Sequence, residues 1–165
     1  MKTFKYIATA MLVCASLSLC ACDDDDDEDD EVVEEDYSYV ESAAGNYTVT
    51  LTGYNEACNE ILAEAQTGSA KVTCDNDNVE FIFDGDTYSM SNYVEAANGF
   101  FFNVNSITVD DAKLVGFDIF QVTLSNGSVA YKHGCYAKSD KQFVFYMKTT
   151  IDGQIVVFEF NCIKK

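Results

Sequence analysis

Apolar side chains alternate with polar ones along several stretches of this chain, and this period of two constrains the fold more than any other feature. Successive side chains of a β-strand point to opposite faces of the sheet, so each stretch predicts a strand with one buried face. The alternating apolar sets are Tyr47, Val49 and Leu51; Val79, Phe81 and Phe83; Phe120, Val122 and Leu124; Phe143, Phe145 and Met147; and Val156, Phe158, Phe160 and Cys162. Half-buried antiparallel strands are the structure that this pattern predicts.

Short turn sequences separate these stretches. They are Asp75-Asn76-Asp77-Asn78, Asp84-Gly85-Asp86, Ser125-Asn126-Gly127, Lys138-Ser139-Asp140 and Asp152-Gly153. Loops as short as these connect strands as hairpins, so we expect consecutive strands to be neighbours. We therefore predict an all-β fold, an antiparallel up-and-down β-barrel, because closure removes exposed sheet edges. An open two-layer β-sandwich is the alternative.

One segment breaks the alternating pattern. In residues 55–66 (NEACNEILAEAQ), the side chains of Ile61, Leu62 and Ala65 would share one face of a helix. We predict one short helix here, and we expect it to cover one end of the barrel.

The first 22 residues have the features of an export signal. Lys2 and Lys5 precede an apolar stretch, residues 7–19, which is too short to span a bilayer, where about 20 residues are needed. The end of this segment, Leu19-Cys20-Ala21-Cys22, resembles the lipobox of bacterial lipoproteins. The resemblance implies that residues 1–21 are a lipoprotein signal peptide and that Cys22 is the lipidated first residue of the mature chain.

Two other interpretations of this segment stay open. Cys20 has a Leu three places before it, as the family pattern requires, but the bulky Leu19 stands immediately before it, whereas Cys22 follows the small Ala21. An ordinary cleaved signal peptide would leave no anchor. If Cys22 is lipidated, its acyl chains attach the protein stably to a membrane, since each buried methylene contributes about 0.8 kcal/mol.

An acidic run follows Cys22 directly. Residues 23–36 (DDDDDEDDEVVEED) carry 12 of the 28 acidic residues, and such dense like charge predicts an extended, disordered tether. A run of this kind next to the lipidated cysteine resembles the lipoprotein export signal of Gram-negative gut anaerobes. It implies an outer-membrane lipoprotein that faces the cell exterior. In enterobacterial systems, by contrast, an Asp in the place of Asp23 would favour retention in the inner membrane.

Residues 37–165 form the predicted domain. Its start (GNYTVTLTG), its middle (GFFFNVNSITVDD leading into FDIFQVTL) and its end (KSDKQFVFYMKTTIDGQIVVFEF) resemble the calycin-like β-barrel domains found on lipoproteins of the same bacteria. The likeness covers residues 45–163 and lies in the strand pattern. It implies a lipocalin-like barrel but identifies no site residues, and the lipocalin Gly-x-Trp signature is absent because the chain has no Trp.

Charge and composition exclude several functions. The net charge is -18, with 10 basic residues against 28 acidic ones, so the chain lacks the basic clusters that bind nucleic acid. A single histidine, His133, and the lack of a Cys-x-x-Cys pair argue against a metal site and against most acid/base chemistry. We predict a hydrogen-bonded structural role for His133, and no enzyme activity, catalytic residue or cofactor. The carboxylate pairs Asp84 and Asp86, and Asp110 and Asp111, are interpreted as turn residues.

Four cysteines remain in the predicted domain: Cys58, Cys74, Cys135 and Cys162. Export to an oxidising compartment makes them candidates for disulfides, and four cysteines allow three full connectivities. In an up-and-down barrel Cys74, Cys135 and Cys162 fall near strand ends at one rim, which favours one bridge among these three. The alternative is that all four are buried as small apolar side chains.

The aromatic content suggests what the domain binds. Twelve Phe and ten Tyr can line a small barrel, which either fills its interior or holds one small ligand. Our first hypothesis is a barrel that binds a small apolar ligand or an extracellular partner, such as a glycan or a protein on a host or cell surface. Tyr88, Tyr93, Tyr131 and Tyr136 would stack on sugars if they are exposed. The alternative is a structural or adhesive surface module without a small ligand.

Overall fold

The computed structural model describes residues 38–76 and 78–165. The predicted signal peptide (1–21), the lipidated Cys22 and the acidic tether (23–36) lie outside these residues. The described part is all-β and antiparallel, as the alternation of apolar residues predicts, and it contains one helical turn. None of its helices has the length and apolar character needed to cross a membrane.

In its described part the chain forms one short helix and twelve strands. The elements are α2 (Ser38–Glu41), β1 (Gly45–Asn55), β2 (Ile61–Asp75), β3 (Asn78–Phe83), β4 (Asp86–Ala96), β5 (Gly99–Val104), β6 (Ile107–Val109), β7 (Ala112–Gly116), β8 (Phe120–Thr123), β9 (Val129–Lys132), β10 (Gly134–Ala137), β11 (Gln142–Ile151) and β12 (Gln154–Lys164).

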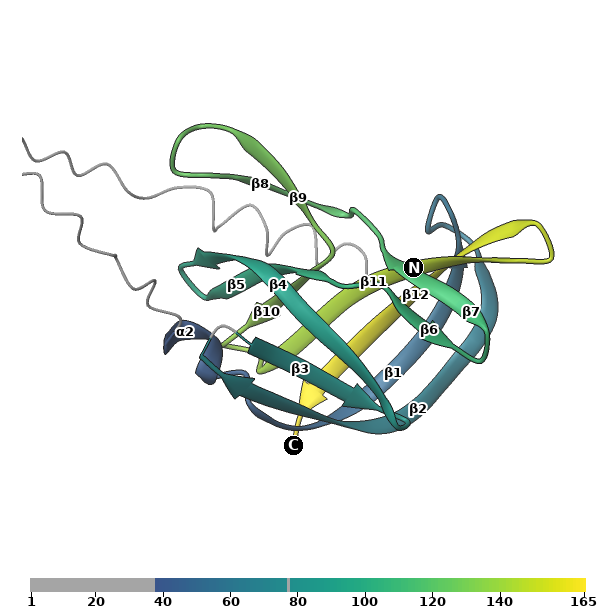
Figure 1. Cartoon of the computed structure of the whole chain (residues 1–165), viewed down its shortest axis with the longest axis horizontal. Coiled ribbons are helices and arrows are strands. Elements are labelled where there is room, and N and C mark those ends of the chain that lie inside the picture. The colour runs from purple at the N-terminus through teal and green to yellow at the C-terminus, as the bar shows by residue number, and fades with distance from the viewer. Residues whose placement is uncertain (1–37, 77) are drawn as a thin grey trace, which may run out of the picture. The chain divides into compact units, whose positions relative to one another are not determined.

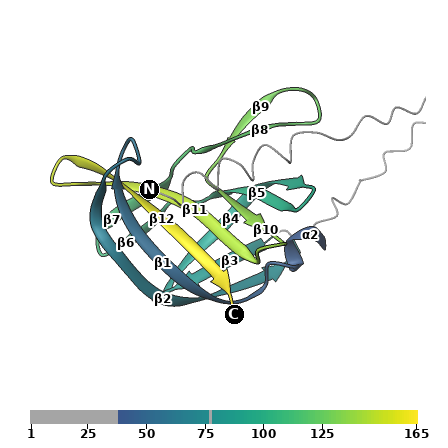
Figure 2. The ribbon, with the colours of Figure 1, turned by 180° about the vertical axis from the view of Figure 1, so that it is seen from behind.

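Eight of these strands form a ring, which Figures 1 and 2 show from two sides. The order around the ring is β1-β2-β3-β4-β5-β10-β11-β12, and β12 pairs with β1. The ring closes at β10, because Gly134 lies opposite Phe102 of β5 and also opposite Phe145 of β11. The strands follow one another in sequence except between β5 and β10. There the chain leaves the ring to form the hairpins β6–β7 and β8–β9.

The helix predicted for residues 55–66 is wrong, because this segment turns the chain between β1 and β2. The side chain of Asn55 shapes the turn, since its Oδ1 accepts a hydrogen bond from the Asn59 amide at 3.1 Å. From Ile61 onward the chain pairs with β1. Ile61 and Leu62, which a helix would bury, are exposed. Backbone pairing with β1 therefore outweighs the local preference for a helix.

Aromatic side chains fill the interior of the ring. Phe145 and Phe160 stack with ring centroids 4.4 Å apart and planes 6° apart. Phe81 packs edge-on against both, at 5.1 and 6.2 Å. A second group surrounds Phe100, which contacts Phe143 at 5.9 Å. All of these residues are buried, so the alternating sets that contain Phe81, Phe143 and Phe160 identified the core face of their strands correctly.

The segment 38–44 covers one end of the ring. Val40 and Ala43 are fully buried within the main apolar core. Side chains of four ring strands donate hydrogen bonds to the backbone carbonyls of this segment. They are the Cys74 Sγ to Val40 O (3.3 Å), the Tyr136 hydroxyl to Ser42 O (3.0 Å), the Lys164 Nζ to Ser42 O (3.0 Å) and the Tyr47 hydroxyl to Ala43 O (2.5 Å). These bonds fix the stretch of chain that joins the domain to the predicted tether.

The β6–β7 hairpin covers the other end (Figure 1). It is attached to the ring by β7, which pairs with β11 at Met147 and Lys148. Leu114 of β7 is buried in the apolar core, and Ile107 and Val109 of β6 pack against that core. Side chains of the protein itself therefore cover the aromatic interior at both ends.

Candidate functional site

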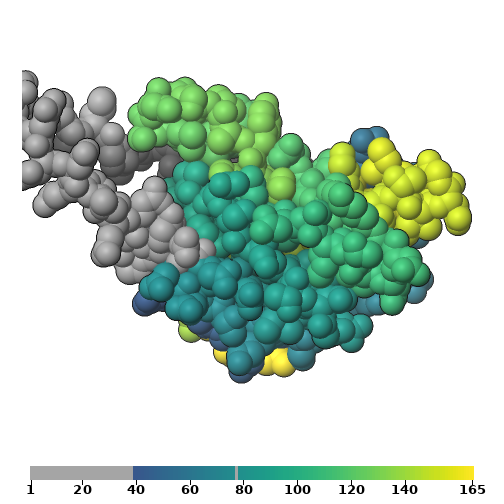
Figure 3. Space-filling view, in the orientation of Figure 1, coloured from purple at the N-terminus to yellow at the C-terminus, as the bar shows by residue number. Residues whose placement is uncertain are grey.

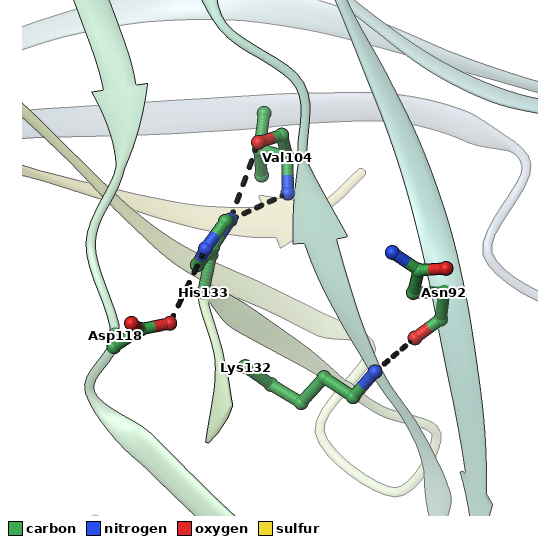
Figure 4. Close-up of polar contacts among 5 residues, drawn as sticks. All are labelled: Asn92, Val104, Asp118, Lys132 and His133. Carbon is green, nitrogen blue, oxygen red and sulfur yellow. Dashed lines mark hydrogen bonds and ion pairs between the residues drawn. The ribbon is translucent and has the colours of Figure 1, made fainter. Parts of the chain in front are cut away.

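The β8–β9 hairpin projects from the ring, and its base is the candidate functional site. We call residues 117–133 the arm. The two ends of the arm meet at β11, because the Phe117 amide donates to Tyr146 O and the Tyr146 amide donates to His133 O. Asp118, Lys132 and His133 lie at this base (Figure 4). It contains the one histidine of the sequence and a buried lysine.

His133 occupies the point where the chain leaves the ladder with β5. The regular pairing of β10 with β5 ends at Gly134 and Phe102, and the His133 amide donates to Phe102 O at 3.0 Å. The next backbone groups on this edge of β5 are the amide and carbonyl of Val104. They would pair with β10 if β10 continued as a strand. The imidazole takes that place: its Nδ1 lies 2.9 Å from Val104 N and 3.2 Å from Val104 O.

The role of Nδ1 depends on the tautomer of the imidazole. In the neutral tautomer that carries its proton on Nε2, Nδ1 accepts the bond from the Val104 amide. Nε2 lies 3.4 Å from Oδ1 of Asp118, whose side chain is mostly exposed. Burial lowers the pKa of His133, while the charge of Asp118 acts in the opposite direction. The ring is therefore held as a neutral bridge between β5 and the arm.

Gly116 makes room for this imidazole. A Cβ atom at position 116 would lie 1.9 Å from Nδ1 of His133 and 2.1 Å from its Cε1. No side chain fits at that distance, so any other residue at 116 would displace the imidazole from Val104. The last residue of β7 and the first residue after β9 are thus matched in shape.

Lys132 makes the equivalent contact with β4. The pairing of β4 with β5 shifts register between Ser91 and Val94, and Asn92 has a positive φ of 52°. This bulge leaves the carbonyl of Asn92 without a ladder partner, and the Lys132 ammonium donates a hydrogen bond to it (Figure 4). The lysine is only 6% exposed, and burial lowers its pKa.

The arm base can hold the arm, but its groups are poorly placed for catalysis. Nδ1 of His133 is occupied by a backbone amide, and Nε2 faces a carboxylate, so neither nitrogen is left to activate a nucleophile. Across residues 38–76 and 78–165, no three or more His, Cys, Asp or Glu side chains are grouped to hold a metal ion. His133 could be singled out from the sequence, but Lys132 and Gly116 could not. The only signal for Lys132 was a charged residue beside the histidine in an otherwise apolar stretch, and Gly116 had none.

A buried tyrosine–glutamate pair lies beside the arm. Tyr146 donates a hydrogen bond of 2.6 Å to Oε2 of Glu159, its cross-strand partner on β12. Phe120 of the arm packs against the Tyr146 ring, with centroids 6.0 Å apart. Burial, and next the charge of Glu159, raise the pKa of Tyr146. Both side chains are on the outer face of their strands, opposite to the aromatic interior. The alternating apolar sets of the sequence therefore did not include them.

The four cysteines of the domain are spread over the ring. Cys74 bonds to the segment 38–44, Cys162 is buried in the core, and Cys58 lies in the turn between β1 and β2, and not on a helix. These three thiols are free in the structure. Cys135 is half-buried in β10. A disulfide among the four stays a prediction.

The carboxylate pairs of the sequence lie at two separate turns. Asp84 is in the turn between β3 and β4, and Asp110 and Asp111 form the turn between β6 and β7, all three with positive φ angles of 46–67°. Asp86 begins β4. Turn geometry thus accounts for Asp84, Asp110 and Asp111, because Asp tolerates the left-handed backbone, whereas Asp86 was predicted as a turn residue and is a strand residue.

Of the four tyrosines considered for sugar stacking, one is well exposed. Tyr88 and Tyr136 are buried in the core, and Tyr93 is half-buried, with its hydroxyl bonded to Met90 O at 2.7 Å. Tyr131, on β9 of the arm, is 55% exposed.

Comparison with known proteins adds no relative: the chain has no significant match to a family model, a curated protein or a solved structure. The resemblance to calycin-like lipoproteins therefore stays a prediction.

Proposed function

We propose that this chain is a lipid-anchored lipoprotein of the outer membrane, and that its domain binds an extracellular partner on its outer surface. In this proposal the ring is a calycin-like β-barrel. That part is supported by eight antiparallel strands that follow one another around a closed ring with a single excursion. The anchor and the location are supported by the sequence of residues 1–36, with Cys22 as the lipidated residue.

The packed interior is the observation that carries the proposal. Phe81, Phe145 and Phe160 are in mutual contact, and the ends of the ring are covered by Val40 and Leu114. Removing a buried Phe ring from such contacts costs about 3–5 kcal/mol. An interior ligand would lose that much of its binding free energy, roughly 150-fold to 4000-fold in affinity. A partner outside the ring meets no such cost, so the packing favours an outer binding surface over an interior carrier.

A non-enzymatic function is part of the proposal. Its support is that the imidazole of His133 is engaged by Val104 and Asp118, and that the paired carboxylates lie at two separate turns. Hydrolases that use two carboxylates place them across a cleft from each other.

The test is whether apolar molecules enter the ring. We would use the full chain carrying Cys22→Ser, so that no detergent competes, and measure Tm with and without benzene. We expect no benzene-dependent rise in Tm for this chain. With Phe145→Ala added, benzene should raise Tm, because an apolar cavity of this kind stays dry and binds benzene.

The outcome that contradicts the proposal is equally specific. If N-phenyl-1-naphthylamine binds the chain saturably and dodecanoate displaces it, the interior accepts a small apolar ligand after all. Phe145→Ala serves as the matched control, since it shows that the assay detects an interior site when one exists.

A further inference from the structure

The arm presents an exposed face that the packing of the domain does not use. Val129 and Tyr131 alternate on β9 and are 50% and 55% exposed. Their cross-strand partners on β8 are Thr123 and Gln121, and both are exposed. We call these four residues the arm platform. In the space-filling view of Figure 3 the arm is the green lobe that projects from the body of the protein.

The opposite face of the arm holds it to the ring. Phe120 alternates with Gln121 along β8 and packs against Phe101 of β5 and Tyr146 of β11, at 5.9 and 6.0 Å. Lys132 alternates with Tyr131 along β9 and reaches Asn92 of β4. The platform therefore lies on the solvent side of a hairpin whose other side is anchored.

Hydrogen bonds fix the arm at its tip as well as at its base. At the tip, Oδ1 of Asn126 accepts bonds from the amide and the hydroxyl of Ser128, at 2.9 and 2.6 Å. Leu124 and Ser128 are joined by a backbone bond of 2.8 Å. At the base, His133 and Lys132 hold the arm to β5 and β4. A surface fixed before binding loses little conformational entropy on binding, so even a small contact area is useful.

The charge of the arm defines what kind of molecule suits it. Residues 119–131 contain no Asp, Glu, Lys or Arg, although residues 37–165 as a whole carry 16 acidic residues and 8 lysines. The charged neighbour in sequence, Lys132, points to the other face. The platform therefore offers no charge to a ligand. Its polar groups are the amide of Gln121 and the hydroxyls of Thr123 and Tyr131, and each of these can both donate and accept hydrogen bonds.

The size of the platform favours a small ligand over a folded protein as its binding partner. Two strands of four residues cover about 13 Å by 10 Å, or roughly 130 Å². A stable interface between folded proteins needs about 800 Å² from each partner. One exposed aromatic ring with neighbouring amide and hydroxyl groups is instead the chemistry that recognises a sugar: the C–H groups of a pyranose face pack on the electron-rich face of the ring, and its hydroxyls bond to the polar side chains.

We propose that the arm platform binds a neutral carbohydrate, with one sugar ring stacked on Tyr131 and its hydroxyl groups bonded to Gln121 and Thr123. This inference rests on the proposed function, because it names the chemistry of the extracellular partner and the surface that meets it. It requires nothing of the interior of the ring.

The experiment uses the full lipidated chain in lauryldimethylamine oxide micelles and four neutral probes: maltohexaose, cellohexaose, laminarihexaose and mannohexaose. We expect at least one of them to shift the backbone amide resonances of residues 121, 123, 129 and 131. Tyr131→Ala should weaken that binding roughly tenfold, as removal of a stacking contact does, whereas Tyr131→Phe should retain it. Ile163→Ala is the matched control, because it shortens an exposed apolar side chain on β12, away from the arm.

Four results would overturn the inference. The first is that none of the four sugars shifts these resonances. The second is that Tyr131→Ala and Ile163→Ala bind equally well. The third is that the same resonances shift with protein concentration alone, which would make a second copy of the chain the occupant. The fourth is that oligogalacturonate, a charged sugar, binds as tightly as the neutral ones. None of these results bears on benzene or dye binding, so the proposed function stands or falls separately.

Discussion

Nδ1 of His133 lies 2.9 Å from the amide nitrogen of Val104, in the place where a neighbouring strand would pair with β5. The ammonium of Lys132, the residue before it, donates a hydrogen bond to the carbonyl of Asn92 in β4, which also lacks a strand partner. Buried backbone groups without partners cost about 1–3 kcal/mol each. The two consecutive side chains therefore provide hydrogen-bond partners for backbone groups of the ring at the point where the arm leaves it. This relationship explains why a His and a buried Lys are adjacent in an otherwise apolar stretch.

The first prediction concerns pH. Burial lowers the pKa of His133 below its ordinary value of 6.5, which is the value expected in the unfolded chain. The unfolded state then binds the proton more readily, so the free energy of unfolding is unaffected above pH 6.5 and decreases as the pH falls from 6.5 through the lower pKa of the folded state. The slope should not exceed about 1.4 kcal/mol per pH unit from this one group.

The comparison chain is His133→Gln, whose amide can still bond to Val104 but does not titrate. Denaturant unfolding at several pH values gives the difference between the two chains, and the many carboxylates cancel in that difference. Parallel stability profiles for the two chains between pH 4 and 8 would show that His133 is not the group responsible.

The second prediction concerns Gly116. Its φ is not in the left-handed region, so an Ala there meets no backbone strain, and the cost comes only from the overlap of its Cβ with the His133 ring. We expect Gly116→Ala to lower the free energy of unfolding by about 1–3 kcal/mol, as overpacking does. In a His133→Ala background the ring is gone, and the same substitution should cost much less.

Urea unfolding of the two single variants and the double variant measures this coupling directly. Contacting residues typically show interaction energies of about 0.5–3 kcal/mol in such a cycle. Additive effects of the two substitutions would mean that Gly116 and His133 do not touch.

Four ring strands, β1, β3, β11 and β12, could be predicted from the sequence because their apolar residues alternate with polar ones and reveal the buried face. Phe143, Phe145 and Met147 illustrate this, since all three are buried where the pattern placed them. The turns at Asp84, Asn126 and Asp152 were also predicted correctly, because Asp, Asn and Gly favour the turn backbone.

Two features could not be predicted, for physical reasons. The helix assigned to residues 55–66 fits a local pattern, but pairing with β1 is a contact between distant parts of the chain, which no local pattern reports. The sequence likewise does not show that the chain leaves the ring between β5 and β10, because β8 and β9 have the same alternation as ring strands. Lys132 and Gly116 become meaningful only when that departure brings them next to β4 and His133.

The third prediction concerns alkaline pH. Burial raises the pKa of Tyr47 and of Tyr146 above the ordinary value of 10. Because the folded state keeps these phenols protonated, the stability that they contribute is complete below pH 10 and is lost as the pH rises above it. Absorbance at 295 nm should show a group of tyrosines that ionise only when the chain unfolds. In Tyr146→Phe that group should be smaller by one, and an unchanged number would place Tyr146 in contact with solvent.

The last prediction tests the anchor. If Cys22 is the lipidated residue, Cys22→Ser removes the acceptor of the acyl chains, and the protein should move from the membrane fraction to the soluble fraction. The expected change is nearly complete, because each buried methylene contributes about 0.8 kcal/mol and two or three acyl chains contribute many. Immunoblots of separated fractions measure it.

Cys20→Ser is the matched control, since it changes the same atom two residues earlier. A chain lipidated at Cys22 stays in the membrane fraction when Cys20 is replaced, and the reverse result would move the lipid to Cys20. Retention of both variants in the membrane would mean that the chain is held there by something other than its lipid. Protease treatment of intact cells then locates the domain. Because the dense negative charge of residues 23–36 is repelled by an anionic membrane surface, a domain on the outer face should stand clear of the lipid and be cleaved before the outer membrane is broken.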